Sequence, residues 1–317
     1  MIRLSFRAMA SPVHLHAAAQ DPRAAAAARR ARAVFAAVEA AASRFRPSSP
    51  WVRLMRAPGT WQTVPRLLAE LADLADMWRR ATGGLFDPRI LPQLIRAGYP
   101  GAPLPAELPA ESPPDPWWEV APHAQPQLCR MRLWWPADLG GIGKGFACDR
   151  AAAAIQPLLT DFALDAGGDI ALRGRGDGPG GTWTTGIEDP LSRATVLACF
   201  DAVAPCAVAT SAARRSGPSA DPSLRHLIDP RSGEPVASGI AAVTVVGDGV
   251  VTAEVTAKTL LIAGPPALAA TEDWPRPVWW VGGTGEVSGN RAGRAAIRSG
   301  APPRHADKPM PTEAWIR

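Results

Sequence analysis

The sequence predicts an α+β fold in which mixed sheets are flanked by helices. Strand-like and helix-like segments alternate along the chain without a regular strand–helix–strand rhythm. The chain has 317 residues, of which 47% are hydrophobic and 20% charged, so it is long enough to bury a large core. No segment approaches the roughly 18 to 20 continuous apolar residues that a membrane-spanning helix needs.

The N-terminal part of the sequence predicts strands followed by two helices. Residues 2–18 alternate polar and apolar side chains, which is typical of one long strand or a strand pair. An Asp-Pro pair begins a predicted helix over residues 21–42. Residues 44–62 show little periodicity and predict a loop. The leucines of residues 63–84 fall on one helical face and predict an amphipathic helix that ends at two glycines.

The centre of the sequence is marked by residues 100–126, which contain nine prolines. This composition predicts a surface excursion without regular helix or central strand. The chain after residue 282 is rich in Gly, Arg and Pro and predicts a poorly ordered tail, so we expect one domain over residues 1–282 and a tail over 283–317. Between the proline-rich segment and the tail we expect strands at 128–135, 161–173, 183–188, 194–203, 224–228, 241–247 and 278–281, and helices at 143–159 and 252–263.

Charge and cysteine content narrow the function class. The net charge is +5, and only three of the 34 basic residues are lysines, Lys144, Lys258 and Lys308. The arginines are scattered rather than clustered, which argues against nucleic-acid binding. The four cysteines show no zinc-binding spacing, so we expect reduced core thiols. The first residues lack a signal-peptide pattern, which predicts a cytoplasmic protein.

A glycine-rich motif over residues 138–149 lies between a predicted strand and a predicted helix. Glycines at a helix N-terminus let the backbone approach an anion, and Lys144 adds a mobile positive charge. The motif therefore indicates phosphate binding, although a tight strand-to-helix turn would explain the same residues. It is neither a Walker A motif nor a dinucleotide fingerprint.

Three further motifs admit a structural and a functional interpretation. Residues 165–170 place glycines beside carboxylates, which suits a site or a simple turn. Residues 209–212 with 226–233 supply Ser, His and Asp, but no nucleophile elbow supports a catalytic triad, and residues 229–233 suit a turn. Glu254 and Lys258 are four residues apart on one predicted helix, where an ordinary solvated ion pair is the simplest interpretation.

Taken together and in this order, these motifs resemble the ApbE-type FAD:protein FMN transferases. The resemblance also includes residues 6–11, 43–47 and 83–88, and covers roughly residues 4–265. It implies an α+β fold with a flavin site in a cleft, and a flavin transferase domain over residues 1–282. It also implies an enzyme that moves FMN from FAD to a Thr or Ser hydroxyl of an acceptor flavoprotein and releases AMP.

The sequence leaves the catalytic base open, whereas the resemblance assigns metal and flavin contacts to individual residues. Asp165, Asp169 and His226 are all candidates for the base that activates the hydroxyl, and nothing in the sequence ranks them. The metal ligands, by resemblance for Mg²⁺, fall on the Gly141 carbonyl and on Glu254, Ala257 and the position of Lys258. The flavin-side contacts fall on Met9, Phe45, Leu85, Phe86, Asp87, Asp138, Lys144 and Ile228.

Two residues depart from the family pattern at the expected metal site. Glu254 stands where the family typically has Asp, and Lys258 stands where it has Thr. A protonated lysine has no acceptor lone pair and cannot ligate magnesium, although its ammonium can substitute for the charge of a cation. The sequence therefore leaves two alternatives, a transferase and an FAD-binding protein whose metal-dependent transfer is lost or altered.

Overall fold

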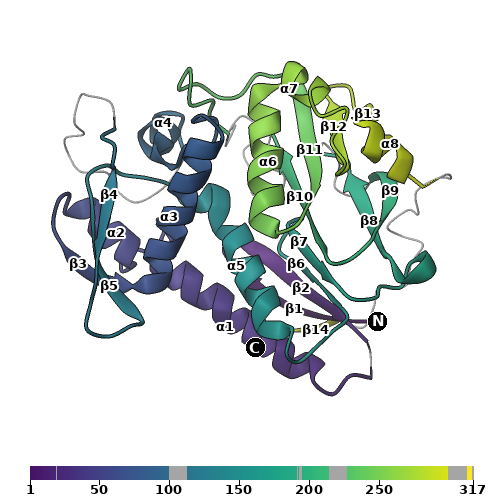
Figure 1. The fold of residues 1–317 in the computed structure, drawn as a ribbon, viewed down its shortest axis with the longest axis horizontal. Coiled ribbons are helices and arrows are strands. Elements are labelled where there is room, and N and C mark those ends of the chain that lie inside the picture. Colours follow the sequence, from purple (N-terminus) through teal and green to yellow (C-terminus); the bar gives the residue numbers. More distant parts are fainter. Residues whose placement is uncertain are drawn as a thin grey trace. The chain divides into compact units, whose positions relative to one another are not determined.

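The fold is that of a computed structural model, which describes residues 1–18, 20–99, 113–190, 192, 195–213, 227–298 and the backbone of 313–315 (Figure 1). The chain forms two compact units. Unit 1 consists of residues 1–35, 144–227 and 236–317, and unit 2 of residues 36–143 and 228–235. Each unit combines helices with mainly antiparallel strands, so the predicted α+β class is confirmed. The single domain predicted over residues 1–282 stays a prediction.

Unit 1 is built on a nine-stranded sheet in the order β13-β12-β11-β10-β7-β6-β2-β1-β14. Among the described strands, neighbours are antiparallel except β1 and β14, which are parallel. The bounds are Ile2–Ala8 (β1), Ser11–Ala17 (β2), Phe162–Asp165 (β6), Ile170–Arg173 (β7), Cys206–Ala212 (β10), Ile240–Gly247 (β11), Val278–Gly282 (β12), Val287–Gly289 (β13) and Glu313–Trp315 (β14).

Two layers cover the β10–β11 part of this sheet. On one face, Cys206 and Val208 of β10 pack with Trp183 and Phe200 of the antiparallel pair β8 (Trp183–Glu188) and β9 (Val196–Ala202). Successive residues of a strand point to opposite faces, so the intervening residues of β10 point to the other face. There, helix α6 (Val250–Ala263) packs on β10 and β11 (Figure 1).

The remaining helices of unit 1 complete its outer layers. Nine of the 14 residues of α6 are buried, and the charged residue Glu254 is one of them. Helix α1 begins in unit 1 and ends in unit 2, and helix α5 begins in unit 2 and continues into unit 1. The bounds are Ala24–Ala42 (α1), Gly140–Ile155 (α5), Pro179–Gly181 (η2), Pro265–Ala269 (α7) and Arg291–Ala296 (α8).

Unit 2 has a three-stranded sheet, β3-β5-β4, and two buried tryptophans pack together in its core. The rings of Trp51 and Trp117 meet edge to face with centroids 6.4 Å apart. Both indole N–H groups donate within this core, Trp51 to the Ala137 carbonyl and Trp117 to Asp76 Oδ1, each at 2.8 Å. The bounds are Pro50–Arg56 (α2), Gln62–Pro65 (β3), Arg66–Ala81 (α3), Pro88–Ile90 (η1), Leu91–Arg96 (α4), Trp118–Ala121 (β4) and Leu128–Leu133 (β5).

Three segments differ from the sequence prediction. The predicted loop at 44–62 contains helix α2, whose Ser49 side chain accepts a hydrogen bond from Val52 N–H. The predicted excursion at 100–126 contains strand β4, held in place because the preceding Trp117 is fully buried. The predicted tail contains β13 and α8, whose apolar side chains pack on the core of unit 1. Residues 100–112, 194, 224–226, 299–312 and 316–317 of the predicted elements lie outside the described residues.

Other sequence expectations are confirmed. The N-terminal segment, predicted as one long strand or a strand pair, is the hairpin β1–β2, and the segment predicted as a strand at 161–173 is two strands that form the hairpin β6–β7. All four cysteines are buried, as expected for core thiols. In the part of the chain that the structure describes, every helix is too short or too polar to cross a membrane.

The turn of the β1–β2 hairpin is conformationally strained. Ala8 pairs with Ser11, so Met9 and Ala10 form a two-residue turn with φ values of 50° and 60°. Such turns match the twist of the flanking strands but favour Asn-Gly, because a Cβ atom clashes in the left-handed region. The register of the hairpin therefore imposes a strained conformation on two residues with side chains.

We expect Ala10→Gly to stabilise the protein, because glycine adopts a positive φ without the Cβ clash. The gain in unfolding free energy should be about 1 kcal/mol, measured by urea denaturation. Ala18→Gly is the matched control, since Ala18 is also exposed and lies outside the positive-φ residues. An Ala10→Gly protein no more stable than the control would contradict the assigned strain.

Candidate functional site

Helices α5 and α6 approach closely at Gly145. Glu254 Oε2 of α6 accepts a hydrogen bond from the Gly145 N–H at 2.9 Å. A Cβ atom at residue 145 would lie 2.6 Å from this oxygen and 3.1 Å from Val251 Cα, so only glycine fits. One turn later in α5, Asp149 accepts from the N–H groups of Val250 and Val251 at 2.8 and 3.0 Å. Asp149 thus caps the N-terminus of α6.

An ionic cluster of two buried carboxylates and two half-buried lysines lies at this helix contact. Lys144 of α5 forms an ion pair with Asp169, whose side chain is 2% exposed. Lys258 Nζ of α6 lies 3.6 Å from Glu254 Oε1, so the expected pair of these two residues is present, but Glu254 is buried and Lys258 half-buried rather than solvated. We name these four residues the ionic cluster.

The charges within the ionic cluster act on the pKa values of its members. Desolvation lowers the pKa of the Lys144 ammonium, but the charges of Asp169 and Glu254 outweigh it, so this pKa lies above its usual value. Desolvation raises the pKa of the Glu254 carboxyl, and the charge of Lys258 opposes this rise. The chain itself therefore supplies the positive charges that compensate its buried carboxylates.

The loop between β6 and β7 presents a third carboxylate, Asp165. Its Oδ1 accepts from the Gly168 N–H at 2.8 Å, and Gly167 and Gly168 have φ values of 70° and 95°. The turn predicted here is present, and the Asp165 side chain bonds to its backbone. Burial, helped by the charge of Asp169, raises the pKa of Asp165 to about 6.

Unit 2 presents an exposed aromatic ring on a buried guanidinium group. The Arg44 guanidinium lies 4.2 Å from the centroid of the Phe45 ring. Arg44 is 4% exposed and its Nε lies 3.3 Å from Asp138 Oδ1, whereas Phe45 is 58% exposed. Asp138 also accepts from the Gly140 N–H at 2.8 Å, at the first residue of α5. An aromatic ring held in this way offers one face for stacking.

The segment before η1 lies beside Asp138. The Asp138 N–H donates to the Pro88 carbonyl at 2.7 Å. Asp87 caps η1 through the Arg89 N–H at 2.9 Å and pairs with the Arg89 side chain. Phe86 is buried beside it in sequence, while Leu85 is half-buried. This segment and Asp138 thus form one backbone-linked corner of unit 2.

The structure divides the predicted site residues between the two units. Met9 lies in the strained turn of unit 1, and Ala257 is buried in α6. Ile228 is buried in unit 2 and pairs with Pro235, in front of the predicted turn at 229–233. His226 lies outside the described residues. Unit 1 brings together Lys144, Asp165, Asp169, Glu254 and Lys258, and unit 2 brings together Phe45, Leu85, Phe86, Asp87 and Asp138, with Gly141 in α5.

Sequence reasoning missed two residues. The sequence does not distinguish Arg44 from the other arginines, of which the chain has 31 in all, although Arg44 directly precedes Phe45 in a family motif. Asp149 was expected only on a helix, because a side chain that caps a helix distant in sequence leaves no local signal. Both act through backbone or side-chain contacts that the fold creates.

The residues of unit 1 do not fit a divalent metal. Glu254 offers both oxygens to groups of the chain, the Gly145 N–H and the Lys258 ammonium. Ala257 has no side-chain ligand, and an ammonium cannot donate a lone pair to a metal. Among the described residues, no group of three or more His, Cys, Asp or Glu side chains is placed to hold a metal ion.

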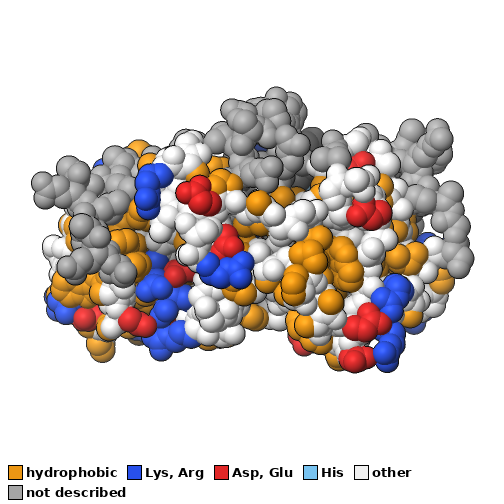
Figure 2. All heavy atoms as spheres, turned by 90° about the horizontal axis from the view of Figure 1, so that it is seen from above, with side chains coloured by type: hydrophobic (Ala, Val, Ile, Leu, Met, Phe, Trp, Pro, Cys, Tyr) orange, Lys and Arg blue, Asp and Glu red, His pale blue; other side chains and the backbone are white. Residues whose placement is uncertain are grey.

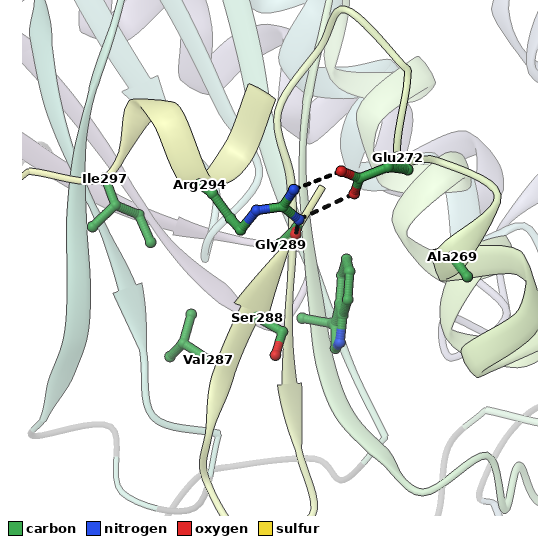
Figure 3. A pocket seen from close by; sticks show the side chains of 8 residues that line it. Ala269, Glu272, Val287, Ser288, Gly289, Arg294 and Ile297 are labelled. Atoms are coloured by element: carbon green, nitrogen blue, oxygen red, sulfur yellow. Dashed lines mark hydrogen bonds and ion pairs between the residues drawn. The ribbon is translucent and has the colours of Figure 1, made fainter. Parts of the chain in front are cut away.

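A surface hollow of about 530 Å³ lies on other elements of unit 1. Figure 3 shows Arg294 and Glu272 joined across it, with Nη1 and Oε2 3.0 Å apart, beside Val287 and Ile297. The described members of the predicted site do not line it. On the face in Figure 2, acidic and basic side chains lie next to one another at several places.

Comparison with known proteins identifies the family. The family model for the ApbE family matches residues 9–276. The chain therefore belongs to the ApbE family, as the motifs predict. The FAD:protein FMN transferase of Klebsiella pneumoniae is 27% identical over 130 residues, which are 40% of this chain and 37% of that protein. The FAD:protein FMN transferase of Vibrio cholerae is 30% identical over 129 residues, 40% of this chain and 38% of that protein.

Solved structures support the fold. The flavin transferase ApbE from Vibrio cholerae matches with a TM-score of 0.73 and 20% identity, over 93% of this chain and 98% of that chain. The ApbE protein from Thermotoga maritima matches with a TM-score of 0.74 and 21% identity, over 94% and 99%. The sequence alignments thus span under two fifths of the curated relatives, while the fold is similar throughout.

We expect the Asp165 carboxyl to make stability depend on pH, because folding raises its pKa from 3.8 to about 6. A carboxyl with a raised pKa contributes stability below its unfolded pKa, and this contribution is lost as pH rises through the folded value. Compared with Asp165→Asn, the native protein should lose about 1 kcal/mol of unfolding free energy between about pH 5 and pH 7.

Urea denaturation of both proteins at the two pH values measures this difference. The Asn variant is the matched control, since it keeps the acceptor for the Gly168 N–H and cannot ionise. A stability gap between the two proteins that is equal at both pH values would contradict the assignment.

Proposed function

We propose that this protein is an FAD:protein FMN transferase. The observation that carries the proposal is the match of the ApbE family model to residues 9–276. Curated relatives that carry this activity in their names support it. So do two separate features, the exposed Phe45 ring, which suits a flavin, and the half-buried Lys144 ammonium, which suits a phosphate.

In the proposed reaction, a Thr or Ser hydroxyl oxygen of an acceptor flavoprotein attacks the phosphorus of the FMN half of FAD. The new P–O bond forms as the bond to the AMP phosphate breaks, and AMP leaves with that electron pair. The hydroxyl proton passes to a base. Asp169 is engaged by Lys144, so Asp165, with its raised pKa, is the described candidate for this base.

Positive charge must stabilise the phosphates as AMP departs. We propose that Lys144 provides part of it, because its ammonium is fixed by Asp169 at the glycine-rich start of α5. The Mg²⁺ of the resemblance would be held by Gly141, Glu254 and Ala257, but the contacts of Glu254 disfavour this. The predicted cytoplasmic location stays a prediction, and four cysteines without disulfide bonds support it.

We propose that Phe45 stacks on the isoalloxazine ring. Its ring is exposed and fixed from behind by Arg44, which Asp138 holds in turn. The ring is therefore oriented before the flavin arrives, and less conformational freedom is lost on binding. Asp138 and the residues 85–87 complete the proposed flavin contacts of unit 2, with Met9 and Ile228 as further proposed contacts.

The proposal is tested by incubating the purified protein with FAD and candidate acceptor flavoproteins, one at a time. We expect AMP in the supernatant, detected by chromatography, and an acceptor that stays fluorescent in denaturing electrophoresis.

Phe45→Ala should weaken FAD binding about tenfold, since aromatic stacking contributes about 1 to 1.5 kcal/mol. Met77→Ala, another exposed apolar residue, is the control and should bind FAD normally.

Tight FAD binding without AMP release from any acceptor would contradict the transferase and favour the alternative, an FAD-binding protein of this fold. Equal FAD affinities of the Phe45→Ala and Met77→Ala proteins would contradict the stacking role.

A further inference from the structure

The pair of Glu254 and Lys258 differs from an ordinary helical ion pair. Exposed pairs four residues apart contribute a few tenths of a kcal/mol at most, and they keep their hydration. Here the two side chains are 6% and 14% exposed. Burying two charges costs more than one weak pair restores, so this arrangement is poorly explained by stability alone.

The carboxylates of the ionic cluster already have positively charged partners, which disfavours the binding of a divalent cation. Asp169 is paired with Lys144, and Glu254 with Lys258 and the Gly145 N–H. A divalent cation at Glu254 would have to displace an ammonium and remain close to it in a poorly hydrated site. Repulsion between like charges is strong in such surroundings.

Lysine usage in the sequence points the same way. Only three lysines occur among 34 basic residues, and two of them, Lys144 and Lys258, belong to the ionic cluster. Arginine carries a broad planar group, whereas the lysine ammonium is a compact, strongly hydrated charge. Of the two side chains, lysine is the closer substitute for a small metal cation.

We propose that the Lys258 ammonium, fixed by Glu254, binds the diphosphate of FAD in place of a divalent metal. This inference rests on the proposed function. Glu254 then acts as a positioning residue, because it orients the ammonium through one oxygen and anchors to α5 through the other. The chain carries its own cation, and FAD binding does not depend on magnesium.

Calorimetry on the full-length protein tests this directly. FAD is titrated in EDTA and in millimolar magnesium, and magnesium is titrated into the protein alone. We expect the FAD dissociation constant of the native protein to change less than about twofold between EDTA and magnesium, and the magnesium titration to give no saturable heat. Lys258→Gln should weaken FAD binding about tenfold, the effect of one charge-assisted contact.

Three further variants separate the charge from the fold. Lys258→Arg keeps the charge but not the compact ammonium, and should bind FAD more tightly than Lys258→Gln but less tightly than the native protein. Lys308→Gln, which removes the third lysine, makes the same change in net charge and should leave binding unchanged. The double variant Glu254→Asp with Lys258→Thr should bind FAD about tenfold more tightly with magnesium than with EDTA, because oxygen ligands replace the ammonium.

A native protein whose FAD binding fails in EDTA, or that binds one magnesium ion without FAD, overturns the inference. Both measurements use the native protein, so they do not depend on whether a variant folds. AMP release is assayed separately. Magnesium-independent FAD binding without AMP release overturns the proposed function and supports this inference. AMP release that occurs only with magnesium supports the proposed function and overturns this inference.

Discussion

The absence of a side chain at residue 145 is the constraint on which the chemistry of unit 1 depends. Because Gly145 has no Cβ, helix α5 approaches the backbone of α6 closely enough for Glu254 to bond to a helical N–H. The carboxylate is thereby fixed deep in the unit, and Asp149 fixes the start of α6 from the same helix. Side chains one turn away on either helix are then brought to defined positions.

The ionic cluster is a consequence of this contact. Lys144 precedes Gly145 in α5, and Lys258 follows Glu254 by one turn in α6, so the helix contact places two ammonium groups near buried carboxylates. Burying one of these charges without a partner costs free energy, and the ion pairs offset this cost. A ligand with phosphate groups would meet positive charges whose positions are already set, which is the condition for electrostatic preorganisation.

The sequence predicted much of this organisation and missed the parts that only tertiary contacts create. The α+β class and both N-terminal hairpin strands followed from periodicity, and the glycine-rich motif and the departure at Lys258 were visible as residues. Helix α2 and strand β4 were missed, because burial of Trp51 and Trp117 overrides the weak local pattern. The pairing of Lys144 with Asp169, 25 residues away, and the Arg44 support of Phe45 left no signal that spacing could reveal.

The close contact of α5 and α6 fixes the carboxylate of Glu254, and the unfolding free energy of Gly145→Ala tests this contact most directly. The added methyl group would meet Glu254 and the Val251 backbone, so we predict a loss of about 1 to 3 kcal/mol. Gly283→Ala is the matched control, because a Cβ there lies 3.4 Å from its nearest neighbour, and it should change stability by less than about 0.5 kcal/mol. Equal stabilities of the two variants would contradict the account.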